Sequence, residues 1–411
     1  MRLMVTTDQR FGCTPDGAVW TPGLFAYPFW TRYLAVFEHV RVVGRVQDID
    51  VAPADWIRGD GEGVSYVKLP HYVGPLEYLV RVGRIRGVIQ QAMRSEDAII
   101  LRASSTIGSA VEPFLTRDRR PYGVEVVTDP YDVFAPGSIK HPLRPYFRWR
   151  FPQKLRRQCA AACCVSYVTK AALQQRYPPS PGAYTTHYSS VELPDKAFVT
   201  QARSFQQGTN PYTLITVASL ANLRKATDVL LKAVKICVDA GTNLKLVVVG
   251  DGRRRPDLEG LVDALGLGSR VLFTGNLLPG DPVRSQLDQA DLFVLPSHME
   301  GLPRAMIEAM ARALPCIGST VGGIPELLPS EDMVPPGDAQ SLAGKIQEIL
   351  STPERMTRMS ARNLDIAQEY EEGILRKRRA EFYEHLRDAT ASWLKSHVGK
   401  RTYAVHGLQT D

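Results

Sequence analysis

The sequence predicts an α/β protein whose C-terminal half contains a doubly wound parallel sheet. The chain has 411 residues, 44% hydrophobic and 23% charged, which are ordinary values for a globular protein large enough for two domains. Short apolar segments such as YTLITVASL and LKLVVVG show no polar alternation, as expected of strands buried on both faces. Segments with apolar residues at helical spacing lie between them, and strands that alternate with helices form parallel sheets.

The N-terminal half, residues 1–207, is less regular but also predicts an α/β domain. Its strand candidates are RLMVTT, VRVVGRV, DAIILRAS, GVEVVTD and AACCVSYVT. Residues 15–28 are rich in proline and glycine, so we expect the first strand to lead into an extended loop.

The second predicted domain comprises residues 208–365 and begins at the turn GTNP. One helix ends near Gly241, and another begins at Pro256 and ends near Gly266, where glycine favours a helix stop. RVLFTG, DLFVLPS and LPCIGST are further short strands. We expect residues 366–411 to form a polar helix that returns towards the N-terminal domain, followed by a tail.

The net charge of +7 is concentrated in residues 140–158, which contain seven lysines and arginines, four aromatic residues and no carboxylate. Cations beside aromatic rings suit the boundary of an anionic bilayer. A solvated loop and helix face is the alternative that stays open. Stacking on nucleic acid is the weaker interpretation, and we expect no nucleic-acid partner.

The cellular setting is predicted from three features. No segment approaches the roughly 18 apolar residues that a membrane-spanning helix needs. The start of the chain, MRLMVTTDQRFG, is too short and polar for a signal peptide. The six cysteines have neither a disulfide pattern nor a zinc-site spacing. We therefore expect a cytoplasmic protein without a bound metal. The basic segment 140–158 adds the interpretation that the protein lies peripherally at the inner face of the membrane.

The most specific stretch of the chain extends from Pro296 to Leu328. A strand ends at Leu295, and the loop Glu300-Gly301-Leu302-Pro303 leads into a helix that begins near Arg304. Proline is tolerated at this first position. The unpaired N–H groups of a helix start favour a diphosphate, and Gly301 lets the backbone approach a ligand closely.

Two carboxylates flank this position. Glu300 precedes the helix and can reach the sugar end of a nucleotide donor. Glu308 lies about one turn inside the helix, where it can accept paired hydrogen bonds from ribose hydroxyls. If only their spacing is considered, the alternative is that both are surface glutamates on an amphipathic helix.

This stretch resembles the signature of family 4 glycosyltransferases, also called glycosyl transferases group 1. In that signature a glutamate, seven residues and a second glutamate precede an Ala-Met helix, a proline before a strand and a Gly-Gly-x-x-Glu turn. Glycine turns upstream also match, and the resemblance covers about residues 212–350 well and the first 200 residues loosely. The matching positions are Glu300, Glu308, Ala309, Met310, Pro315, Gly322, Gly323 and Glu326, with Gly250 and Gly275 upstream.

The resemblance implies a GT-B fold, with two Rossmann-like doubly wound domains that face a central cleft. It implies a retaining hexosyl transfer from a nucleotide-sugar, of the UDP-sugar or GDP-mannose type, without a metal cofactor. Lys225 matches the lysine that neutralises the diphosphate, but Ser219 occupies the usual arginine position, so the adjacent Arg224 is the candidate replacement. The implied donor-binding residues are Lys225, Arg224, Gly250, Gly275, Gly301, Leu302, Pro303, Glu308 and Glu326, with Glu300 at the reacting sugar.

The N-terminal domain should supply the acceptor site. Gly12 and Gly17, in a loop after the first strand, are candidates to approach the donor, or are plain turn residues. Asp129 and Asp132 are candidates to bind an acceptor hydroxyl, or are turn and cap residues. No histidine is assigned a catalytic role.

The expected acceptor is a lipid-linked glycan in cell-surface polysaccharide assembly, with a soluble acceptor as the alternative. Three competing functions are an epimerase on the same scaffold, an NAD-dependent oxidoreductase and a binding protein that has lost activity. The second lacks a G-x-G-x-x-G turn after a first strand. The third conflicts with the intact Glu300, Glu308 and Lys225.

Overall fold

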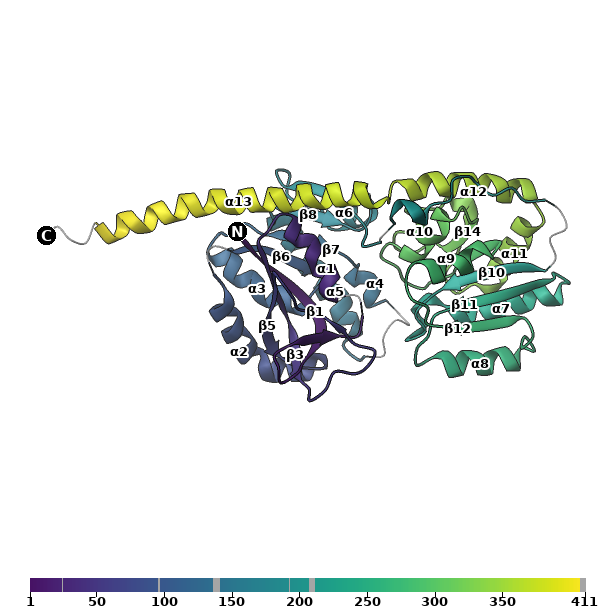
Figure 1. The fold of residues 1–411 in the computed structure, drawn as a ribbon, viewed down its shortest axis with the longest axis horizontal. Helices are drawn as coiled ribbons and strands as arrows, with labels where there is room; N and C mark the ends of the chain where they lie inside the picture. The colour runs from purple at the N-terminus through teal and green to yellow at the C-terminus, as the bar shows by residue number, and fades with distance from the viewer. Residues whose placement is uncertain (24, 95–96, 136–140, 192, 207–210, 407–411) are drawn as a thin grey trace.

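The computed structural model describes the chain apart from residues 24, 95–96, 136–140, 192, 207–210 and 407–411. Two sheets, each covered by helices, form two domains that lie side by side (Figure 1). Strands between residues 2 and 187 build the first sheet, and strands between residues 212 and 334 build the second. The predicted fold class, two Rossmann-like α/β domains, is confirmed.

The N-terminal sheet is parallel in its centre, with the strand order β5-β3-β1-β6-β7-β8-β9. The chain adds β3 and β5 on one side of β1 and β6 to β9 on the other, so the direction of winding reverses between β1 and β6. Such a reversal is the usual ligand position of doubly wound sheets. The strands are β1 (Arg2–Cys13), β2 (Val19–Thr21), β3 (His39–Asp48), β4 (Ile57–Arg58), β5 (Val64–Pro70), β6 (Asp97–Ala103), β7 (Gly123–Val126), β8 (Cys164–Tyr167) and β9 (Tyr184–His187).

The first strand is longer than RLMVTT and crosses an irregularity between Thr6 and Arg10. Within it, the carboxylate of Asp8 accepts hydrogen bonds from the N–H groups of Thr106 and Ile107, at 2.7 and 3.1 Å. The expected extended loop over residues 15–28 is partly a hairpin, because β2 pairs antiparallel with the end of β1.

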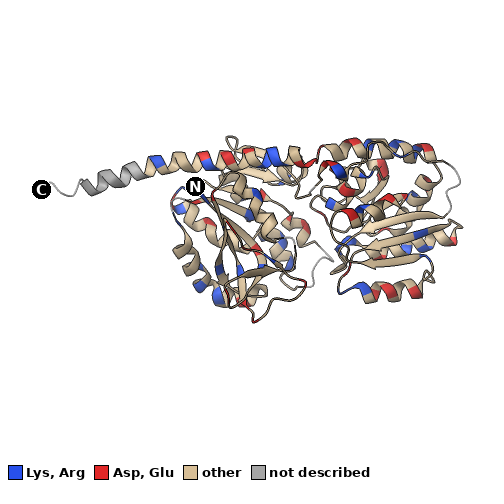
Figure 2. Cartoon of the chain, viewed as in Figure 1, with Lys and Arg blue, Asp and Glu red and all other residues tan. Residues whose placement is uncertain are grey.

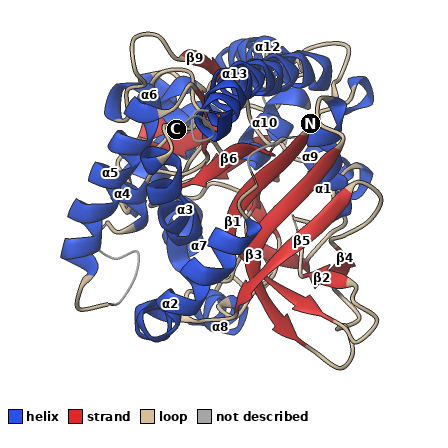
Figure 3. Ribbon diagram, turned by 90° about the vertical axis from the view of Figure 1, so that its left-hand side faces the viewer, coloured by secondary structure: helices blue, strands red, loops and turns tan. Residues whose placement is uncertain are grey.

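Helices cover both faces of the N-terminal sheet. One buried cluster packs α2, α3 and α5 on one face (Figure 3). α1 and the C-terminal helix α13 cover the other. The basic segment predicted over residues 140–158 falls largely on α5. The helices of this domain are α1 (Tyr27–Thr31), α2 (Gly74–Ala92), α3 (Thr106–Arg117), α4 (Pro130–Val133), α5 (Arg144–Ala161) and α6 (Ala172–Arg176).

The C-terminal sheet is wholly parallel, with the order β12-β11-β10-β13-β14-β15. Its winding reverses between β10 and β13. The strands are β10 (Tyr212–Val217), β11 (Leu244–Val249), β12 (Val271–Gly275), β13 (Leu292–Leu295), β14 (Cys316–Ser319) and β15 (Met333–Val334). The helices are α7 (Thr227–Asp239), α8 (Arg255–Ala264), α9 (Asp281–Asp288), α10 (Arg304–Ala311), α11 (Ala339–Leu350) and α12 (Pro353–Gln368).

The last helix, α13 (Glu372–His406), leaves the C-terminal domain and lies along the N-terminal one (Figure 1). Phe382, Tyr383 and Leu386 are buried there. A single apolar cluster extends from Trp30 of the first domain through these side chains to Met306 of α10, so the two domains share packed surface. Within the described chain, every helix is too short or too polar to cross a membrane.

Candidate functional site

Four loops of the C-terminal domain meet where the winding of its sheet reverses. They follow β10, β11, β12 and β13, whose carboxyl ends lie at one edge of the sheet. In doubly wound folds this crevice binds the ligand. The predicted donor-binding residues between Arg224 and Glu308 lie on these loops or on α10.

Glu300 and Lys225 meet at the centre of this edge. The Lys225 ammonium Nζ is 2.6 Å from Glu300 Oε1, and the Ser297 hydroxyl donates a hydrogen bond of 2.6 Å to the same oxygen. The Glu300 side chain is buried, so its charge needs these partners. A carboxylate and an ammonium predicted to contact the same donor therefore converge on one point.

The Lys225 position depends on an unusual backbone. A 3₁₀ turn, Leu223–Lys225, is capped by the Asn222 side chain, which accepts the Arg224 N–H at 3.0 Å. Ala226 follows with φ of 51°, a left-handed conformation that non-glycine residues adopt rarely. The Arg224 carbonyl accepts the His298 N–H at 2.8 Å, which links this turn to the loop that contains Glu300.

Glu308 lies in a different part of the cleft. Burial raises the pKa of its carboxyl group, and the positive charges of Arg304 and Arg284 oppose that rise. Glu308 lines a cavity of about 510 Å³ between the domains. Gly280, Arg284 and Arg304 line it from the C-terminal domain, and residues of α1, β6 and the segment 193–197 line it from the other side. A ligand bound to Glu308 would thus lie against both domains.

Two predicted glycines are required, Gly250 by close packing and Gly275 by its backbone conformation. A Cβ atom on Gly250 would lie 2.0 Å from the Ala218 carbonyl oxygen, and its φ is 137°. The Gly250 N–H also donates to the Gly275 carbonyl at 2.9 Å, and Gly275 has a φ of 75°. These glycines let three loops approach one another at the sheet edge.

Gly301, Leu302 and Pro303 connect β13 to α10, as predicted. A Cβ on Gly301 would lie 3.0 Å from the Val127 carbonyl oxygen, so this glycine also permits contact with the N-terminal domain. The Leu302 side chain packs into the apolar core. Pro303 is the N-cap of α10.

Glu326 is placed at the domain boundary. Its carboxylate oxygens accept hydrogen bonds from the N–H groups of Lys170, Ala171 and Ala172 at 2.5, 3.0 and 2.7 Å. These groups begin α6, where unpaired N–H groups favour a negative charge. The structure therefore gives Glu326 a cap role across the domains, which the predicted donor contact did not include.

The acceptor-side candidates have structural roles in the N-terminal domain. Gly12 pairs with Trp20 in the β1–β2 hairpin, and Gly17 has a φ of 87° in its turn. Asp129 is the N-cap of α4, accepting the Tyr131 N–H at 2.8 Å. Gly17 and Asp129 thus have the turn and cap roles that the sequence left open, whereas Gly12 lies within β1 and not in a loop after it.

Asp129 and Asp132 are also tied to one cation. Asp129 forms an ion pair with Arg176 and accepts a hydrogen bond from the Tyr177 hydroxyl. Asp132 lies 3.5 Å from Arg176, and burial together with the Asp129 charge raises the pKa of its carboxyl group. Asp132, partly exposed, has more freedom to meet a ligand than the buried Asp129.

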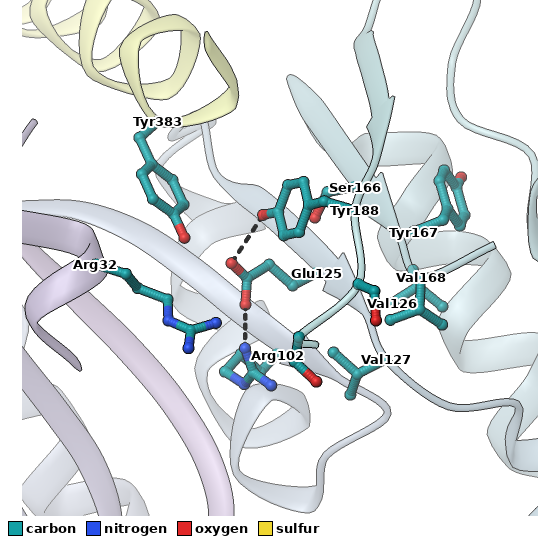
Figure 4. Close-up of a pocket in the computed structure, with 12 residues that line it drawn as sticks. Arg32, Arg102, Glu125, Val126, Val127, Ser166, Tyr167, Val168, Tyr188 and Tyr383 are labelled. Atoms are coloured by element: carbon teal, nitrogen blue, oxygen red, sulfur yellow. Dashed lines mark hydrogen bonds and ion pairs between the residues drawn. The ribbon is translucent and has the colours of Figure 1, made fainter. Parts of the chain in front are cut away.

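A buried polar cluster next to the cleft was missed from the sequence (Figure 4). Glu125 of β7 is paired with Arg102 of β6 at 2.5 Å and accepts hydrogen bonds from the Tyr33 and Tyr188 hydroxyls at 2.9 and 3.0 Å. Arg102 and Arg32 also line the 510 Å³ cavity. The signal was present, since DAIILRAS and GVEVVTD each place one charged residue inside an apolar strand.

In the described part of the chain, no three histidine, cysteine, aspartate or glutamate side chains are grouped so that they could hold a metal ion.

Comparison with known proteins assigns the C-terminal half to a family. Residues 211–352 match the family model "Glycosyl transferases group 1". Protein CapJ of Staphylococcus aureus is 25% identical over 80% of this chain and 81% of its own length. The amylovoran biosynthesis glycosyltransferase AmsK of Erwinia amylovora is 34% identical, but the match spans only 32% of this chain and 34% of AmsK.

Comparison of structures covers both domains. Anabaena HepE, solved in complex with UDP-glucose, superposes with a TM-score of 0.61 at 17% identity, covering 93% of this chain and 98% of HepE. That likeness extends the assignment of fold to the N-terminal half. Residues 211–352 therefore match the glycosyl transferases group 1, and the chain as a whole has the GT-B fold of glycosyltransferases.

Proposed function

We propose that this glycosyltransferase moves a hexosyl residue from a nucleotide-sugar to a glycan acceptor, with retention at the anomeric carbon. The observation that carries the proposal is the convergence of Glu300 and Lys225, 2.6 Å apart, at the reversal point of the C-terminal sheet. Glu308 on the adjoining helix lines the interdomain cavity, where it would hold the ribose.

The proposed reaction exchanges one bond at the anomeric carbon. The bond from this carbon to the diphosphate oxygen breaks, and the acceptor oxygen forms its bond on the same face of the sugar. The acceptor hydroxyl proton passes to the departing phosphate oxygen. Lys225 stabilises the negative charge that develops on this phosphate. Such electrostatic stabilisation by a preorganised group is usually the largest single contribution to catalysis. Glu300 orients the sugar by accepting hydrogen bonds from its hydroxyl groups.

The proposed donor is a UDP-sugar or a sugar nucleotide of the GDP-mannose type. The UDP-glucose complex of HepE, which shares the fold of this chain, supports the former. Lys225 would neutralise the diphosphate without a metal, and Arg224 is the proposed second cation. Arg224 follows Asn222 in the capped turn, so its main chain is fixed beside the site.

The proposed acceptor is a lipid-linked glycan in the assembly of a cell-surface polysaccharide. The relative AmsK is named as a glycosyltransferase of amylovoran biosynthesis, which supports a glycan acceptor. The proposed setting is the cytoplasmic face of the membrane, with α5 at its surface. Tyr146 and Trp149 of α5 are exposed among arginines, an arrangement that suits the headgroup region.

A transfer assay tests this proposal. Purified protein is incubated with radiolabelled UDP-glucose, UDP-N-acetylglucosamine or GDP-mannose and with either a bacterial lipid extract or soluble oligosaccharides. We expect label to enter the lipid fraction from one donor, with the anomeric configuration of the donor retained in the product by NMR. Label found only in the soluble oligosaccharides would show that the acceptor is soluble and not lipid-linked. A product with inverted anomeric configuration would contradict the retaining mechanism.

A further inference from the structure

The helix α2 has two apolar faces. At about 100° per residue, Tyr78, Ile85 and Ile89 fall on one side, and they pack against the N-terminal core. Val73, just before the helix, and Leu76, Leu79 and Val80 fall on the opposite side, with 52, 78, 64 and 86% of their surface exposed. We call these four residues the outer stripe of α2. Clustered exposed apolar side chains mark an interaction surface.

A basic groove borders the outer stripe. It has a volume of about 520 Å³ and lies between α2 and the carboxyl ends of β3 and β5. Lys68, His71, Arg81 and Arg84 line it together with the carboxylate of Asp48, and Glu77, just outside the lining, forms an ion pair with Arg81 at 3.6 Å. Burial, together with the charges of Arg10 and Arg45, lowers the pKa of His71, as expected in a positive environment. The groove therefore suits an anion.

The groove and the stripe form one continuous surface. On a helical projection Arg84 and Arg81 lie between the outer stripe and the buried face, and Arg86 borders the stripe on its other side. Figure 2 colours the lysine and arginine positions of the chain blue, and in Figure 1 α2 lies on the side of its domain away from the C-terminal domain. Apolar side chains flanked by arginines match the depth profile of a bilayer surface, with acyl chains beneath phosphates.

We propose that α2 binds a membrane lipid, with the lipid phosphate in the basic groove and the outer stripe inserted among the acyl chains. A second copy of this chain fits less well, because a two-fold interface would place the arginines beside the stripe opposite one another. α5, with its exposed Trp149, covers the same sheet face, so both helices can meet one membrane (Figure 3). This inference concerns attachment and does not require the proposed transfer reaction.

Vesicle binding tests the inference. The full-length protein is sedimented with vesicles of phosphatidylcholine alone and of phosphatidylcholine with phosphatidylglycerol in equal parts. We expect binding to the anionic vesicles, and Leu76→Ser with Leu79→Ser, or Arg81→Glu with Arg84→Glu, to weaken it at least about tenfold. The matched controls are Leu272→Ser on β12 and Arg358→Glu on α12, exposed positions of the other domain that should bind as wild type.

Other outcomes overturn the inference. Equal binding by the α2 variants and wild type, or no binding by wild type, would remove α2 as the lipid site. Complete displacement by inorganic phosphate, but not by chloride at equal ionic strength, would assign the groove to free phosphate. A dimer in analytical ultracentrifugation that the Leu76 and Leu79 changes dissociate would assign the stripe to a second copy. If only Trp149→Ser abolished vesicle binding, α5 and not α2 would be the part of the protein that attaches to the membrane.

Discussion

Lys225 and Glu300, at the edge of the C-terminal sheet, hold each other in place by an ion pair. A bound donor would contact both members of this pair. Lys225 is the partner of a buried carboxylate, and its ammonium has room to meet a phosphate because a quarter of the side chain is exposed. Removing the Lys225 ammonium would also leave the buried Glu300 carboxylate without its ion-pair partner. Donor affinity and the catalytic rate should therefore fall together.

Lys225→Ala should lower kcat/KM by about 100-fold or more, since one preorganised charge at a developing oxyanion contributes about that much. Steady-state kinetics with saturating acceptor measure the change. Lys232→Ala, an exposed lysine on α7, is the control and should leave the rate unchanged. A Lys225→Ala enzyme with wild-type kcat/KM would exclude Lys225 from the diphosphate site.

Glu308 predicts a pH dependence of donor affinity. Burial raises the pKa of its carboxyl group above the ordinary 4.5, so protonation begins at a higher pH than in the unfolded chain. The protonated group loses part of its capacity to accept hydrogen bonds, so nucleoside diphosphate affinity should fall as the pH drops through this raised pKa. Calorimetric titration with a nucleoside diphosphate at a series of pH values measures this fall in affinity. Glu308→Gln should bind weakly at every pH, and a parallel pH profile in this variant would assign the titration to another group.

The same shift has a consequence for stability. Because the folded-state pKa lies above the unfolded one, the ionised Glu308 costs stability at every pH above the raised value. Glu308→Gln should therefore raise the free energy of unfolding at neutral pH, because it removes the charge that burial disfavours. Urea denaturation checks this, with the exposed Glu354→Ala of α12 as the control. A loss of stability would show that Glu308 has a stabilising partner.

The elements of the C-terminal domain could be predicted, because strands buried on both faces give uninterrupted apolar segments. The turn around Glu300 followed from the motif. The N-terminal domain was harder, since β5 mixes Lys68 with apolar residues and α2 has two opposite apolar faces, so neither shows a clean period. α5 contains Pro152 within the helix, a residue that usually ends one.

The contact between Glu326 and α6 predicts a coupling between two elements that are 154 to 156 residues apart. Glu326→Ala should destabilise the protein by about 1–3 kcal/mol, because three N–H groups lose their acceptor. Chemical denaturation measures it, with the exposed Glu331→Ala as the control. Glu326→Gln should restore part of the loss. Wild-type stability of Glu326→Ala would mean that water satisfies the start of α6 equally well.

Across the whole molecule, the two domains are joined by more than a linker. A shared apolar cluster, the return of α13 and the approach of Gly301 to Val127 hold the loops of both sheets at one cleft. The sequence predicted two domains and their facing arrangement through a family resemblance. It could not predict which side chains lie at the boundary. The contact of Glu326 with α6 and the positions of Arg32 and Arg102 at the interdomain cavity arise only through long-range packing.

The central claim is a nucleotide donor site that includes Glu308. Calorimetric titration of the full-length protein with UDP, GDP and ADP tests it most directly, repeated on Glu308→Ala and on the control Glu354→Ala. The account predicts that one diphosphate binds, that Glu308→Ala weakens it about 10- to 100-fold through lost hydrogen bonds to a charged group, and that Glu354→Ala binds as wild type. No binding of any diphosphate by folded protein, or equal affinity of Glu308→Ala and wild type, would contradict it.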